Sequence, residues 1–109
     1  MKKNSKKKFN ISKYYPTSIG QAVQHLLYHL PFKDKLEVAI KTERELAKLQ
    51  TSLGNYIQHV FRIDGNMRLI ESCLPHSKKR AIDSEDASKI IIKEFWKQLK
   101  GTQKLAPPK

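Results

Sequence analysis

The sequence has little of three things that mark common classes of small protein: cysteine, glycine and long hydrophobic runs. Cys73 is the one cysteine among 109 residues, so no disulfide can form within the chain. This excludes a disulfide-stapled secreted scaffold and predicts a reducing, cytoplasmic location. Ile70 and Leu74 flank Cys73, which predicts a buried thiol. The longest apolar runs are three residues, against roughly 20 for a spanning helix, so we expect no membrane segment.

Motifs for catalysis and metal binding are also missing. The four glycines form no phosphate-binding loop of the P-loop or Rossmann type. His25 and His29 stand four apart on one predicted helix and could face one metal ion, but two ligands do not make a site, and no HExxH or CxxC accompanies them. The paired acids fall in the first turns of predicted helices, where capping explains them. We therefore expect no catalytic residue, metal, cofactor or small-molecule ligand, and no enzyme.

Positive charge is abundant, and it is concentrated at the ends of the chain. The net charge is +12, but residues 1–17 carry six lysines and no acid, while residues 18–100 carry 14 basic residues against all ten acids. Two short basic runs could contact phosphates in a sequence-independent way. These runs, which are the predicted nucleic-acid-binding residues, are Lys6, Lys7, Lys8, Lys78, Lys79 and Arg80. The alternative is that they are solvated lysines that aid solubility.

The first two predicted helices follow from caps and apolar spacing. Ser18 and Gln21 form a capping box, and apolar residues then recur at a spacing of three and four until Pro31 ends the helix. A shorter helix over about residues 33–41 presents Leu36, Ala39 and Ile40, which we expect to face the core.

A long helix over about residues 43–63 is predicted next, opened by a second capping box at Thr42 and Glu45. Ala47, Gly54 and Phe61 fall seven apart on it. A glycine within a helix costs about 1 kcal/mol relative to alanine, so we expect close approach of another helix to compensate. The alternative makes Gly54 the turn of a helix-turn-helix, but its recognition helix would have few side chains left to read bases.

The last helices complete the pattern. Asn66 caps a helix over residues 67–74, which Pro75 ends, and a loop spans residues 75–83. The final helix starts at residue 83 or 84, carries Trp96 on its apolar face, and ends before Gly101 as its C-terminal stop. We predict helix-packing roles for Ala47, Gly54, Phe61 and Trp96.

These elements predict an all-α fold, a compact bundle of four to five helices around the 43–63 helix. The organisation expected is a disordered basic tail over residues 1–13, a single helical domain over 14–101, and a flexible C-terminal tail over 102–109.

The order of several motifs resembles a family of short bacterial domains of unknown function. The motifs are Leu53-Gly54-x-x-Ile57-x-x-x-Phe61-x-Ile63-x-Gly65-Asn66-x-x-Leu69, then Asp83-x-x-Asp86-x-Ser88-x-Ile90-Ile91, and Trp96-x-x-Leu99. The stretch from Pro16 to Leu26 is similar to the family's opening helix, and the resemblance covers about residues 15–100. The family often has Arg-Asn where this chain has Gln58-His59. The resemblance implies an all-helical fold and no assigned activity.

Function is therefore predicted by class only. The leading hypothesis is a non-enzymatic interaction module that binds a protein partner or itself, because its helices carry more apolar surface than so small a domain can bury. The alternative is an accessory nucleic-acid binder that acts through its basic tail and the 78–80 loop.

Overall fold

The computed structural model describes residues 15–105, with side chains through residue 101, as an all-helical fold without a strand in that range. Five α-helices lie in it: α2 (Ile19–His29), α3 (Phe32–Ala39), α4 (Asn55–Val60), α5 (Met67–Cys73) and α6 (Ser84–Leu105). Four further helical turns join them: η1 (Arg44–Leu49), η2 (Gln50–Gly54), η3 (Ile63–Gly65) and η4 (Leu74–His76). The predicted all-α class is confirmed. The predicted tail over residues 1–13 lies outside the described residues.

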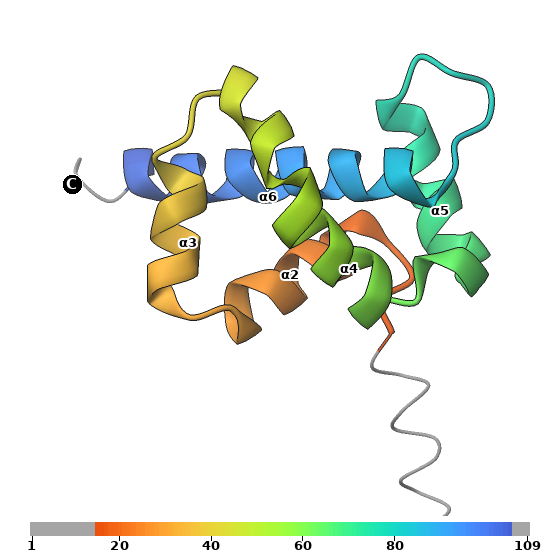
Figure 1. The fold of residues 1–109 in the computed structure, drawn as a ribbon, viewed down its shortest axis with the longest axis horizontal. Helices are drawn as coiled ribbons and strands as arrows, with labels where there is room; N and C mark the ends of the chain where they lie inside the picture. Colours follow the sequence, from red (N-terminus) through yellow and green to blue (C-terminus); the bar gives the residue numbers. More distant parts are fainter. Residues whose placement is uncertain (1–14, 106–109) are drawn as a thin grey trace, which may run out of the picture.

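Helix α6 is the centre of the molecule. Each of the other α-helices packs against it, with α3 towards its C-terminal end and α5 towards its N-terminal end (Figure 1). Its buried side chains recur at the spacing of one helical face. They are Ala87, Ser88, Ile91, Ile92 and Phe95. The prediction that a 43–63 helix is central is wrong, because α6 holds that place.

The 43–63 segment is also not one continuous helix. It is a 3₁₀ turn (η1), a π-helical turn (η2) and the short α4, and Arg62 then turns the chain with a left-handed φ of 51°. The capping box that opens the segment is present: Thr42 N donates to Glu45 Oε1 at 2.9 Å. Gly54 keeps a right-handed helical φ of −62°, so the chain passes straight from η2 into α4. The helix-turn-helix alternative is therefore excluded.

The predicted stop at Gly101 is wrong as well. Helix α6 runs through Gly101 to Leu105, into the segment predicted as a flexible tail. No glycine of the described residues has a positive φ, so Gly101 is an ordinary helical residue and forms no left-handed cap. Residues 106–109 lie outside the described range.

Local signals place the other helix ends close to their predicted positions. Gln21 N donates to Ser18 Oγ at 3.2 Å, which caps α2. Leu30 is extended (ψ 140°) because it precedes a proline, and this ends α2 at His29. Leu69 N donates to Asn66 Oδ1 at 3.3 Å, which caps α5.

One apolar core joins these elements. The largest fully buried side chains come from α2, α4, α5, α6, η3 and the turn between α4 and η3, and they include Leu26, Ile57, Phe61, Ile63, Leu69, Ile91 and Phe95. Cys73 is also fully buried, as predicted. Because α6 contributes buried side chains from Ala87 to Phe95 and contacts every other α-helix, the positions of the surrounding helices depend on it.

Candidate interaction surface

The predicted basic residues are only partly within the described structure. Lys6, Lys7 and Lys8 lie outside it. Lys78, Lys79 and Arg80 are exposed in the loop between η4 and α6. Lys79 Nζ donates to both carboxylate oxygens of Asp86 at 3.1 Å, and this contact lowers the pKa of Asp86. One of the three cations is therefore already paired, and nucleic-acid binding stays a prediction.

The residues predicted to pack helices lie in different surroundings. Phe61 is fully buried, with its ring edge-to-face with His25 at 5.0 Å between centroids. Trp96 is half-buried, and its Nε1 donates to the carbonyl oxygen of Lys41 at 2.8 Å, which ties α6 to the end of α3. Ala47 is exposed, so it does not share a buried line with Gly54.

Gly54 is buried, but what requires a glycine here is a side chain of its own segment and not the predicted close approach of another helix. A Cβ at Gly54 would stand 2.7 Å from the amide of Gln50, in the same segment. The missing side chain leaves room for that amide, whose Nε2 donates to Ser88 Oγ at 2.7 Å. Gly54 therefore makes space for a contact between η2 and α6.

Ser88 is the buried polar residue at this junction. Its hydroxyl donates to the carbonyl oxygen of Glu85 at 2.8 Å and accepts from Gln50 and, at 3.5 Å, from Gln58. Gln58 Oε1 in turn accepts from Ser84 Oγ at 3.4 Å. This network joins η2, α4 and α6. No periodic pattern in the sequence predicts it, because its members are polar and the bonds between segments span 26 to 38 residues.

The histidines and the cysteine occupy structural positions. The His25 and His29 rings lie 4.2 Å apart, and burial, followed by the charge of His29, lowers the pKa of His25. Burial raises the pKa of the Cys73 thiol to about 11, so the thiol stays protonated at neutral pH. In the described residues, no group of three or more His, Cys, Asp and Glu could hold a metal ion.

The most distinctive surface is an apolar line on α3. Phe32, Leu36 and Ile40 follow one another at a spacing of four, and they are 75%, 44% and 68% exposed. We call these three residues the α3 stripe. Tyr28, near the end of α2, is 83% exposed. The prediction that Leu36, Ala39 and Ile40 face the core is confirmed for Ala39 and wrong for Leu36 and Ile40.

Another pair of contacts explains which face of α3 is buried. Val38 and Ala39 pack inward, and Lys35 Nζ donates to the carbonyl oxygen of Leu27 near the end of α2 at 2.9 Å. These contacts turn the α3 stripe outward. The sequence signal for the stripe was the Phe32-x-x-x-Leu36-x-x-x-Ile40 spacing, which is the same signal that a core face gives.

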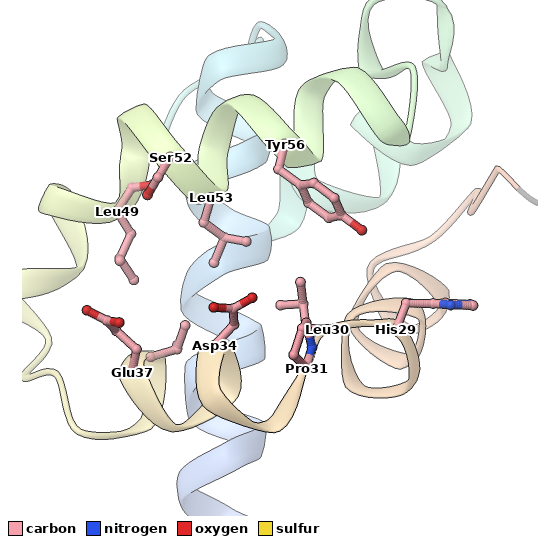
Figure 2. Close-up of a pocket in the computed structure, with 10 residues that line it drawn as sticks. His29, Leu30, Pro31, Asp34, Glu37, Leu49, Ser52, Leu53 and Tyr56 are labelled. Carbon is pink, nitrogen blue, oxygen red and sulfur yellow. The ribbon is translucent and has the colours of Figure 1, made fainter.

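A groove of about 500 Å³ lies on another side of α3, where α3 faces η2 and α4 (Figure 2). Its apolar lining comes from both sides and consists of Leu30, Pro31, Val38, Leu49, Leu53 and Tyr56. Asp34 and Glu37 extend from α3 towards the opposite wall (Figure 2). Glu37 is 3.7 Å from Lys41, whereas no basic side chain of the described residues pairs with Asp34. The groove therefore combines an apolar lining with negative charge.

Comparison with known proteins assigns no activity to the chain. Within residues 15–105, no helix combines the length and the apolarity needed to cross a membrane. No curated protein and no solved structure matches the chain. A family model matches residues 15–99, nearly the range of the resemblance found in the sequence. The chain belongs to the family described as Domain of unknown function (DUF6794).

Proposed function

We propose that this protein is a non-enzymatic interaction module whose contact surface is the α3 stripe, and that it binds a protein partner or a second copy of itself. The observation that carries the proposal is the exposure of Phe32, Leu36 and Ile40 along one line of a helix. Single exposed apolar residues are common on protein surfaces. Three in helical register form a continuous patch, and such patches mark interaction sites.

The geometry suits a partner that offers an apolar helix face or groove. Residues four apart on a helix stack along one side, so the α3 stripe presents three large side chains that can enter a complementary surface together. Aromatic anchors such as Phe32 contribute strongly to interfaces when they become fully buried. The inner contacts of α3, through Val38, Ala39 and Lys35, hold the stripe in place before binding.

The remaining side chains support an interaction role over a catalytic one. Cys73 is buried and protonated at neutral pH, and His25 packs against Phe61. A reducing compartment fits the lone buried thiol.

The test is a comparison of the wild type with the Phe32→Ser/Ile40→Ser double variant. Both residues are exposed, so the free energy of unfolding should change by less than about 0.5 kcal/mol for each. Lys33→Ser, on the same helix, is the matched control. Sedimentation equilibrium over a concentration series measures self-association, and immobilised wild type, control and double variant measure retention of partners from a cell extract.

Self-association, or retention of a defined protein, that is shared by the wild type and Lys33→Ser and lost in the double variant supports the proposal. The proposal fails if all three proteins are monomeric and retain the same set of proteins. It also fails if the double variant keeps the association of the wild type.

A further inference from the structure

We propose that the groove between α3 and the η2–α4 segment binds the chain's own N-terminal segment, residues 6–11, within the same molecule. This segment reads Lys-Lys-Lys-Phe-Asn-Ile, three cations followed by two apolar side chains at alternate positions. The groove carries the complementary features, two carboxylates and an apolar lining. This surface is distinct from the α3 stripe, so the inference does not rest on the proposed function.

Charge complementarity is the first argument. Asp34 and Glu37 extend into the groove, and the carboxylate of Asp34 is unpaired among the described residues (Figure 2). The folded part of the chain has a small excess of basic residues, so a groove with two carboxylates and no lysine or arginine in its lining stands out locally. Lys6, Lys7 and Lys8 form one of the two runs of three consecutive cations in the sequence. Opposite charges of this kind favour and orient an encounter even where they add little affinity.

Apolar complementarity is the second argument. Leu49 and Leu53 point into the groove from one side, and the ring of Tyr56 lies at one end of it (Figure 2). Phe9 and Ile11 stand two residues apart, so in an extended segment they project to the same side. An extended segment can therefore place both side chains against the apolar lining and its lysines next to the carboxylates.

The described chain begins near one end of the groove, within reach of residues 6–11. Asn66 Nδ2 donates to the carbonyl oxygens of both Pro16, at 2.7 Å, and Phe61, at 3.2 Å, so Pro16 lies at the C-terminal end of α4. Tyr56 lies on the first turn of the same helix, about 8 Å away at 1.5 Å per residue. The seven peptide steps from Tyr15 back to Lys8 span up to about 23 Å. This length exceeds the roughly 8 Å along α4, so the segment can reach the Tyr56 end of the groove.

Because the segment is attached to the same chain, a weak contact is sufficient for it to occupy the groove. A short linker gives its segment an effective concentration on the order of millimolar at a site within reach. Occupancy then depends little on protein concentration and falls with ionic strength, because the charged part of the contact is screened.

The test uses the full chain with a nitroxide spin label on an Asn4→Cys substitution. Cys73 does not compete for the label, because it is buried and its raised pKa keeps it protonated. The expected result is that the amide NMR signals of Leu49, Leu53 and Tyr56 lose most of their intensity relative to the reduced label. The signal of Lys78, in the 77–83 loop, should keep its intensity.

Two matched variants separate binding from chance approach. Asp34→Asn/Glu37→Gln should restore most of the lost intensity at Leu53 and Tyr56, whereas Asp64→Asn/Glu71→Gln, which removes the same charge elsewhere on the surface, should not. Phe9→Ser tests the apolar part and should also restore intensity. The four substituted carboxylates are exposed, so their substitution leaves the described core intact, and Phe9 lies outside the described residues.

Three results would overturn the proposal. One is equal intensity loss at Leu53 and Lys78, and another is intensity loss that is unchanged by Asp34→Asn/Glu37→Gln. The third is intensity loss that vanishes on dilution, or that arises between a labelled chain and an isotope-labelled one, since this would assign the groove to a second copy. None of these outcomes depends on Phe32 or Ile40, so the proposed function is tested separately.

Discussion

At the scale of single residues, the effect of Gly54→Ala on the free energy of unfolding should differ from the effect that helix propensity predicts. Propensity alone would make Gly54→Ala stabilising by about 1 kcal/mol. The added Cβ would instead stand 2.7 Å from the Gln50 amide and displace it from Ser88. Ser88 would keep its bonds to Glu85 and Gln58, and the lost Gln50–Ser88 hydrogen bond is worth about 0.5–1.5 kcal/mol. We therefore expect Gly54→Ala to bring little or none of the propensity gain in the free energy of unfolding, measured by urea denaturation.

The control for this prediction is a double-mutant cycle. In a Gln50→Ala background the obstructing amide is absent, so Gly54→Ala should then bring the propensity gain of about 1 kcal/mol. Gly101→Ala, where nothing lies within 4 Å of the new Cβ, should stabilise α6 by a few tenths of a kcal/mol. Equal effects of Gly54→Ala in both backgrounds would show that Gln50 is not the cause.

His25 predicts a dependence of stability on pH. Burial and the neighbouring His29 hold its pKa below the usual 6.5 in the folded protein, while the unfolded chain protonates near 6.5. The unfolded state therefore binds more protons below that pH, and protonation favours unfolding. We expect the contribution of neutral His25 to be fully present above about pH 6.5 and to be lost as the pH falls through that value towards the folded pKa.

The measurement is the free energy of unfolding between pH 7.5 and about pH 5, compared between variants because other groups titrate in the same range. His25→Gln should flatten the decline. His59→Gln, at an exposed histidine, should keep the slope of the wild type. A slope unchanged by His25→Gln would contradict the assignment.

At the scale of elements, Asn66 links three segments through one side chain. Its Oδ1 caps α5, and its Nδ2 donates to Pro16 and Phe61, so the amide fixes the entry of the chain against the end of α4. We expect Asn66→Ala to lower the melting temperature strongly, because it removes a cap and two donated bonds, each worth about 1 kcal/mol. Asn66→Asp keeps the cap and loses the donated bonds.

The melting temperatures, measured by circular dichroism, should therefore fall in the order wild type, Asn66→Asp, Asn66→Ala. If Asn66→Asp had the melting temperature of the wild type, the two donated bonds would have no effect on stability. If it had the melting temperature of Asn66→Ala, the cap would have no effect on stability.

Elements also show how far the sequence could predict this fold. Caps at Ser18, Thr42 and Asn66 could be predicted, because each bond spans three residues and needs no tertiary contact. The face of α3 could not be predicted, because apolar residues lie on more than one side of this short helix. Its buried face depends on tertiary contacts such as that of Lys35 with Leu27, on different helices.

The same distinction holds for the candidate site. The α3 stripe was visible as a spacing but was assigned to the core, and the groove depends on α3 facing η2 and α4, an arrangement that no local pattern contains. The break of the 43–63 segment was missed for a similar reason. Its π-helical turn brings Gln50 against Ser88, a partner 38 residues away.

At the scale of the whole molecule, the packing of all helices on α6 predicts a single cooperative unfolding transition. Ile91 is fully buried in that helix. Ile91→Ala should lower the free energy of unfolding by about 3 kcal/mol, a large part of the roughly 5–10 kcal/mol expected for a domain of this size. Because α6 touches every α-helix, the loss should appear equally in all of them.

Urea denaturation followed by far-ultraviolet circular dichroism and by Trp96 fluorescence measures this directly. The two curves should coincide in the wild type and shift together in Ile91→Ala, while Lys89→Ala, on the exposed face of α6, should shift them little. Curves that separate would show that part of the bundle unfolds independently of α6.

The position of α6 in the chain also has a consequence for biosynthesis. The helices that cover the core, α2 to α5, are made before the helix that they cover, so their apolar faces have no complete partner while residues 15–83 leave the ribosome. At about 5–20 residues per second, α6 follows within a few seconds. The bundle therefore closes only after its last helix emerges, and during those seconds a chaperone that shields apolar segments has its clearest access to the nascent chain.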